Sequence, residues 1–167
     1  PGVAYLGEVS EKYQLEELEA RTRGFHTWHT SLGGSAYDLG EVEYTVPGVL
    51  SKAPQAISVT LLRPFPNEIK NAMMLIGGLE SLFFIGLIIF VLFKVRPFNW
   101  LKIVWKDPFL FSSWIFVLIF AFAVGFTSYN YGALFRYKIP CMPFYYLILI
   151  IPFLKNKASK LADQSIA

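Results

Sequence analysis

Three long apolar runs in the second half of the chain constrain its fold more than any other feature. Residues 72–93 (AMMLIGGLESLFFIGLIIFVLF) and 109–127 (FLFSSWIFVLIFAFAVGFT) form runs of 22 and 19 residues. At about 1.5 Å per residue, helices of these lengths reach roughly 33 and 28 Å, close to the hydrocarbon thickness of a bilayer, about 30 Å. The third run, 139–154, has 16 residues and three prolines, so a helix there reaches only about 24 Å.

These runs predict an all-α integral membrane protein with about three transmembrane helices. The third run is either a short, tilted or proline-broken span or a re-entrant segment covered by other protein. We favour a span because the polar sequence KNKASK follows it. The chain then divides into an extracytoplasmic, partly helical polar region at 1–71 and a transmembrane region at 72–167.

The distribution of charge predicts the orientation. Residues 1–71 carry a net charge of −3 and residues 72–167 a net charge of +6. Basic clusters occupy the connection at 94–106 and the segment at 155–160, and short basic segments beside membrane spans lie on the cytoplasmic side. We therefore expect the N-terminus outside and the C-terminus inside. The pI near 9.0 fits this orientation, and we expect no nucleic-acid partner.

Outside the spans, the sequence predicts short local elements. Residues 10–24 and the segment SKAPQAISVTLLRPF at 51–65 fit helices, the second lying on the outer membrane surface. The glycine-containing stretch between them fits a loop or a small hairpin. Residues 98–106 are expected to lie flat in the inner interface, where Trp100, Trp105 and Trp114 form an aromatic belt.

Glu80 is the polar candidate within the first span. It lies about 12 Å from the outer end of the run at a helical rise. An ionisable group at that depth costs a few kcal/mol unless it is paired or hydrated, and it then marks a functional site. The alternative is that the span begins near Leu79, which places Glu80 at the level of the lipid headgroups.

Arg136 and Lys138 form the second candidate, on the connection between the last two spans. They lie on the expected outer face, where positive charge is disfavoured, beside Tyr131. Either both side chains snorkel to lipid phosphates, or Arg136 binds a phosphate or pyrophosphate bidentately while Lys138 adds a point charge.

Other chemistry has little support in the sequence. His26 and His29 have a spacing that can chelate a metal, but no Cys, Asp or Glu nearby completes a ligand set, so we expect no metal. Cys141 is expected to be a buried, inert thiol. No phosphate-binding loop, dinucleotide turn or hydrolase motif is present. We expect no cofactor, and the sequence assigns no catalytic residue and leaves open whether the protein is an enzyme.

The motifs GGSAYDLG, LLRPFPNE, GGLESLFF and NYGALFRYKIPCMPF, in this order, resemble the C-terminal region of polytopic bacterial inner-membrane proteins of envelope-polysaccharide assembly. These proteins look related to polyprenyl-linked glycosyltransferases and O-antigen polymerases. The resemblance covers roughly residues 33–154. The matching positions are Arg63, Pro64, Glu80, Asn130, Gly132, Arg136 and Pro143.

The resemblance implies an outer-face site for a sugar linked to lipid pyrophosphate, with Arg136 as the anion contact. Such proteins have many spans before this region, and this sequence has none there, so upstream segments or other transmembrane chains are expected partners besides membrane lipids. We expect the C-terminal portion of an envelope-glycan assembly protein in a bacterial inner membrane. The alternatives are a small non-catalytic accessory subunit, whose small residues such as Gly77 pack against partners, and a transporter fragment that uses Glu80.

Overall fold

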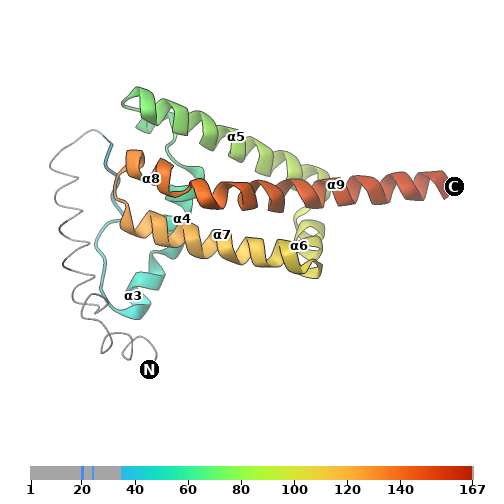
Figure 1. The fold of residues 1–167 in the computed structure, drawn as a ribbon, viewed down its shortest axis with the longest axis horizontal. Helices are drawn as coiled ribbons and strands as arrows, with labels where there is room; N and C mark the ends of the chain where they lie inside the picture. Colours follow the sequence, from blue (N-terminus) through green and yellow to red (C-terminus); the bar gives the residue numbers. More distant parts are fainter. Residues whose placement is uncertain (1–19, 21–23, 25–34, 167) are drawn as a thin grey trace.

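Three long helices lie side by side and form the body of the molecule (Figure 1). The computed structural model describes residues 35–166 together with Ala20 and Gly24, and the predicted helix at 10–24 falls almost entirely outside the described residues. In the described part, the elements are α3 (Val46–Ser51), α4 (Ala53–Leu62), η2 (Pro66–Glu68), α5 (Ala72–Val95), α6 (Pro97–Lys106), α7 (Pro108–Thr127), α8 (Tyr131–Tyr137), η3 (Ile139–Cys141) and α9 (Met142–Ile166).

The long helices α5, α7 and α9 confirm the predicted fold class. Helices of sufficient length and hydropathy to cross a membrane cover Ala72–Val95, Pro108–Thr127 and Ile139–Ala162 among the described residues. The chain is therefore an α-helical integral membrane protein. We call the end of the bundle that carries α8 the α8 end, and the opposite end, crossed by α6, the α6 end (Figure 1).

Polar side chains fix where α5 and α7 begin. The side chain of Asn71 accepts a hydrogen bond from the backbone N–H of Met74 at 2.9 Å. The carboxylate of Asp107 accepts from the N–H groups of Phe109 and Leu110 at 3.0 and 3.2 Å. Such caps satisfy amide groups that the first turn of a helix leaves without an acceptor. Both helices therefore begin within a residue of the predicted apolar runs.

The third helix, α9, is longer than the predicted run and passes through a proline without a break. Pro152 has no N–H, so the carbonyl of Ile148 one turn earlier loses its helical donor. The indole Nε1–H of Trp100 donates to this carbonyl at 2.9 Å. Pro152 is buried beside this contact. A side chain of α6 thus replaces the missing hydrogen bond, and α9 continues to Ile166, well beyond the end of the bundle (Figure 1).

Helix α4, which was predicted to lie on the outer membrane surface, packs against α7. The hydroxyl of Thr60 donates to the carbonyl of Ala121 at 2.8 Å and is fully buried. Ala121 is six residues before the end of α7, about 9 Å along the helix axis. The absence of a side chain at Gly125 allows this approach, because a Cβ there would collide with the carbonyl of Ala56. Helix α4 therefore packs closely against the last two turns of α7.

The α8 end is closed by the segment before α3. Tyr37 N–H donates to the carbonyl of Tyr129 at 3.2 Å, and Tyr131 N–H donates to the carbonyl of Ser35 at 2.9 Å. The hydroxyl of Tyr37 reaches the carbonyl of Gly125 at 2.8 Å, and burial raises the pKa of Tyr37. The described part of the predicted loop or hairpin is thus a loop at 35–45, which covers the end of α7 and the start of α8, followed by the short helix α3.

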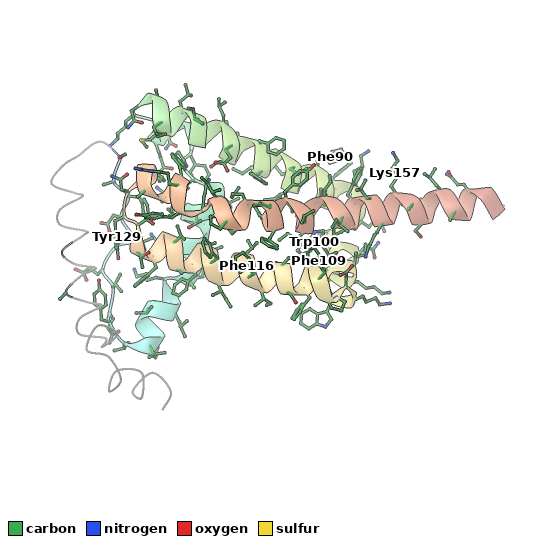
Figure 2. The ribbon with its side chains drawn as sticks, viewed as in Figure 1. Phe90, Trp100, Phe109, Phe116, Tyr129 and Lys157 are labelled. Atoms are coloured by element: carbon green, nitrogen blue, oxygen red, sulfur yellow. The ribbon has the colours of Figure 1, made fainter. Side chains whose placement is uncertain are left out.

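Aromatic side chains fill much of the space between the long helices. The ring centroids of Phe116 on α7 and Phe144 on α9 are 5.0 Å apart, and those of Phe90 on α5 and Phe153 on α9 are 5.3 Å apart. Figure 2 shows Tyr129 at the α8 end and Trp100 close to the α6 end. Large side chains therefore contact one another along almost the whole length of the bundle.

Candidate functional site

The short helix α8 positions most of the predicted site residues. Asn130 precedes it, and its side-chain oxygen accepts from the N–H of Gly132 at 2.7 Å. The helical period places Tyr131, Leu134 and Lys138 on one face, with spacings of three and four residues. All three are at most 2% exposed. Helix α8 therefore turns this face toward α5 and away from the surroundings.

Lys138 is buried and forms an ion pair with Glu80. Its side chain is 1% exposed, and its Nζ lies 3.1 Å from Oε2 of Glu80, whose side chain is 34% exposed. The angles at this contact are not those of a hydrogen bond, and Nζ has no hydrogen-bond acceptor among the described residues. The ring of Phe135 lies 5.1 Å from Nζ and adds a cation–π contact. Glu80 is thus the anion that compensates a buried charge.

A second ion pair lies nearby and involves the segment between α4 and α5. Arg63 forms an ion pair with Glu68, and the hydroxyl of Tyr131 donates to Oε1 of Glu68 at 3.3 Å. The carbonyl of Arg63 accepts from the hydroxyl of Ser81 on α5 at 2.9 Å. Burial raises the pKa of Tyr131, which is opposed by the nearby charge of Arg63. These contacts join the end of α4 to α5 and α8.

Arg136 lies on the opposite face of α8, beside α7. Its Nε donates to the carbonyl of Gly132 at 3.2 Å, one turn earlier, and its side chain is exposed. An open groove of about 500 Å³ lies here, which we call the Arg136 groove. Its lining residues are Phe120, Ala123, Val124, Thr127, Arg136, Tyr137 and Pro140. The groove therefore combines one guanidinium group with a mostly apolar wall supplied by the last two turns of α7.

The structure separates Arg136 from Lys138 and brings Lys138 together with Glu80. Two residues further along a helix, the side chain is rotated by about 200° around the helix axis. Arg136 and Lys138 therefore lie on opposite faces and do not contact one ligand. The ammonium group of Lys138 is inaccessible and pairs with Glu80, which had been a separate candidate. Tyr131 also points inward, toward Glu68. Of the three predicted phosphate contacts, only Arg136 is exposed to a ligand.

Asn130 and Gly132, two matching positions of the resemblance, have a structural explanation here, as do Gly77 and Cys141. Asn130 caps α8, and a Cβ on Gly132 would lie 3.1 Å from the side-chain oxygen of that cap. Gly77 packs under the ring of Phe135, which leaves no space for a side chain. The thiol of Cys141 is buried, as predicted. The apolar groove wall on α7 was not predicted, because an apolar span gives no signal for which face a ligand contacts.

Metal chemistry has no candidate in the part of the chain that the structure describes. No cluster of three or more His, Cys, Asp or Glu side chains occurs there, and His26 and His29 lie outside the described residues. What the geometry offers is a cation at the mouth of an apolar groove, next to two internal ion pairs. Comparisons of the chain with models of protein families, with curated proteins and with solved structures found no match.

Proposed function

We propose that this chain belongs to a protein of cell-envelope glycan assembly that acts on lipid-linked sugars at the outer face of a bacterial inner membrane. The chain is then a C-terminal portion of such a protein. The observation that carries the proposal is the Arg136 groove, in which an exposed guanidinium group lies beside the apolar residues Phe120 and Val124. A polyprenyl phosphate has the matching chemistry, a phosphate joined to a long hydrocarbon chain.

The groove suits such an amphiphile better than a soluble anion. Arginine presents paired N–H donors that match phosphate oxygens, while a hydrocarbon chain can lie along α7 toward Phe120. The hydrogen bond from Arg136 Nε to Gly132 fixes the base of the guanidinium group, so its terminal nitrogens are free to contact the phosphate. The sugar then extends from the α8 end, which is the outer end in the orientation favoured by charge.

Arg136→Ala tests this assignment. A hydrogen bond to a charged group contributes about 1.5–3 kcal/mol, so binding of a polyprenyl diphosphate is expected to weaken roughly 10- to 100-fold. Native mass spectrometry of the detergent-solubilised protein measures this loss, and Arg136→Lys should retain part of the binding. Lys70→Ala, which removes another exposed cation close to the start of α5, is the matched control and should bind normally.

The choice of lipid separates the proposal from simple headgroup snorkelling. Polyprenol without phosphate should bind weakly, and phosphatidylglycerol should not displace polyprenyl diphosphate at equal concentration. If phosphatidylglycerol competes equally, or if Arg136→Ala binds as well as the unchanged protein, Arg136 only snorkels and the proposal is refuted. In cells, Arg136→Ala at normal protein levels is expected to reduce surface glycan.

Two alternatives have less support from the contacts. The accessory-subunit alternative uses small residues to approach partner helices. Gly77 already packs against Phe135 within this chain, and among the glycines of α5 only Gly86, where a Cβ meets no atom within 4 Å among the described residues, is left open for such an approach. The transporter alternative uses Glu80 as an ion relay, but its carboxylate compensates the charge of Lys138. The proposed glycan function makes use of Arg136, which has no ion pair among the described residues.

A further inference from the structure

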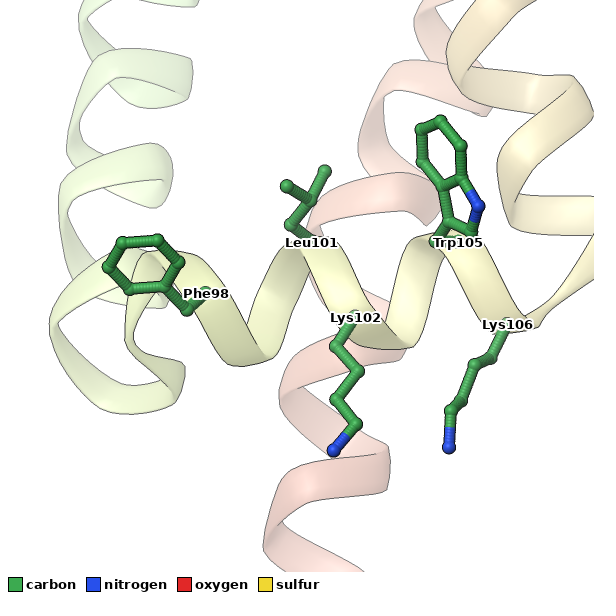
Figure 3. A pocket seen from close by; sticks show the side chains of 5 residues that line it. All are labelled: Phe98, Leu101, Lys102, Trp105 and Lys106. Carbon is green, nitrogen blue, oxygen red and sulfur yellow. The ribbon is translucent and has the colours of Figure 1, made fainter.

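Helix α6 crosses the end of the bundle opposite to Arg136 and has three different faces. One face packs inward, where Val104 is fully buried and Trp100 donates to the carbonyl of Ile148. The outward faces are shown in Figure 3, in which Leu101 and Trp105 point one way and Lys102 and Lys106 point the other. The segment is thus amphipathic, and its polar edge consists of two lysines one turn apart.

The apolar and basic outward faces meet in one shallow groove of about 330 Å³, lined by Phe98, Leu101, Lys102, Trp105 and Lys106. We call it the α6 groove. Phe98 is 85% exposed and Trp105 is 65% exposed. Side chains of this size at the end of a membrane-spanning bundle lie in the boundary between acyl chains and headgroups. Lysines beside them extend their ammonium groups toward water and phosphate.

The charges around the α6 groove are unbalanced. Lys94 and Arg96 are exposed at the start of α6, adding to its two lysines. Asp107 at the end of α6 is already engaged, because its carboxylate binds Lys155 at 2.6 Å and caps α7. Lys102 and Lys106 form no ion pair with any residue that the structure describes, so their positive charge is available to a ligand.

We infer that the α6 groove binds the headgroup of an anionic phospholipid from the adjacent leaflet. The phosphate lies between the ammonium groups of Lys102 and Lys106, and an acyl chain follows the apolar side formed by Phe98, Leu101 and Trp105. A soluble anion or an acidic peptide would leave these large apolar side chains without a partner of their own kind. This inference does not depend on the proposed glycan function, since it concerns the opposite end of the bundle.

The test compares lipid retention by Lys102→Gln/Lys106→Gln and by a control with the same change of charge. Lys157→Gln/Lys160→Gln is that control. Lys157 lies on the part of α9 beyond the α6 end (Figure 2), and Lys160 follows it about one turn later on the same helix. The protein is incubated with equal amounts of phosphatidylglycerol and phosphatidylcholine, and bound lipid is counted by native mass spectrometry. Circular dichroism establishes that each variant keeps its helices, and Lys102→Arg/Lys106→Arg should retain binding.

A lysine near anionic lipid contributes about 1 kcal/mol, which is about fivefold in affinity, so losing both lysines is expected to reduce phosphatidylglycerol binding about 25-fold. The control pair should change it less than twofold, and phosphatidylcholine binding should not change. The inference is overturned if the folded α6 variant binds phosphatidylglycerol normally. It is also overturned if both pairs reduce binding equally, because binding then follows net charge and not the α6 groove.

Discussion

Removing one partner of the ion pair between Glu80 and Lys138 should destabilise the protein by an amount that depends on which partner is removed. Breaking a buried pair costs about 3–5 kcal/mol, mainly because the remaining charge is buried without compensation. Lys138 is 1% exposed, whereas Glu80 is 34% exposed. The two single substitutions therefore leave very different remaining charges, and the two costs should differ.

Glu80→Ala leaves the ammonium group of Lys138 buried beside the ring of Phe135. The cation–π contact is worth about 1 kcal/mol, so the expected loss is about 2–4 kcal/mol. Lys138→Met leaves a carboxylate that water or headgroups can reach, and the expected loss is about 1–2 kcal/mol. The double variant contains neither charge, so its loss should be smaller than the sum of the single losses by about 2 kcal/mol.

The assay is unfolding in mixed micelles with increasing SDS, followed by the helical circular dichroism signal. It gives a free energy of unfolding for each single variant and for the double variant under the same conditions. Equal losses for the two single variants would contradict the difference in burial. Strictly additive losses would show that the two side chains do not interact in the folded protein and would refute the ion pair.

Two further predictions concern the packing of α4 and the α6 end. Gly125→Ala places a methyl group against the carbonyl of Ala56 and should lower the free energy of unfolding by about 1–3 kcal/mol. Gly86→Ala is the control, because a Cβ there meets no atom within 4 Å, and it should not lower the free energy of unfolding in the same SDS titration. The hydrogen bond from Lys155 lowers the pKa of Asp107 in the folded protein. The carboxylate therefore stabilises the folded state at pH values above the pKa of the unfolded chain. This stabilisation is lost as the pH falls through the lower pKa of the folded state. The free energy of unfolding should therefore fall below about pH 4, and it should fall less in Asp107→Asn. If Asp107→Asn shows the same pH dependence as the unchanged protein, the pairing with Lys155 is refuted.

The three spans could be predicted because long apolar runs leave few alternatives in a membrane. The boundaries of the first two agree with the runs within two residues. The third span was predicted to end at residue 154, because the charged side chains of Lys155 and Lys157 are not expected in the hydrocarbon core. A helix does not need to end where the membrane does, however, and α9 continues through residues such as Ala158 that favour helices. Its passage through Pro152 depends on Trp100, a contact that no local pattern reveals.

The candidate site was predicted only in part, because the connection between the last two spans contains the helix α8, for which no helix was predicted. On a loop, Arg136 and Lys138 are near neighbours; on a helix they lie on opposite faces. The spacing of Tyr131, Leu134 and Lys138 was a usable signal, since it is the pattern of a buried helical face. The pairing of Lys138 with Glu80 joins residues 58 positions apart, and a single sequence contains no signal for such a contact.

The position of α4 has a consequence for the order in which the molecule is assembled. During synthesis, α4 leaves the ribosome before α7 exists. The hydrogen bond from Thr60 to Ala121 and the close packing at Gly125 can therefore form only after α7 has been made. The apolar runs of α5 and α7 can enter the bilayer as independent helices, but α4 has no such run. We expect α4 to remain outside the hydrocarbon core until α7 is inserted. Its docking then completes the bundle, and a truncated chain that ends before α7 should leave α4 accessible to protease.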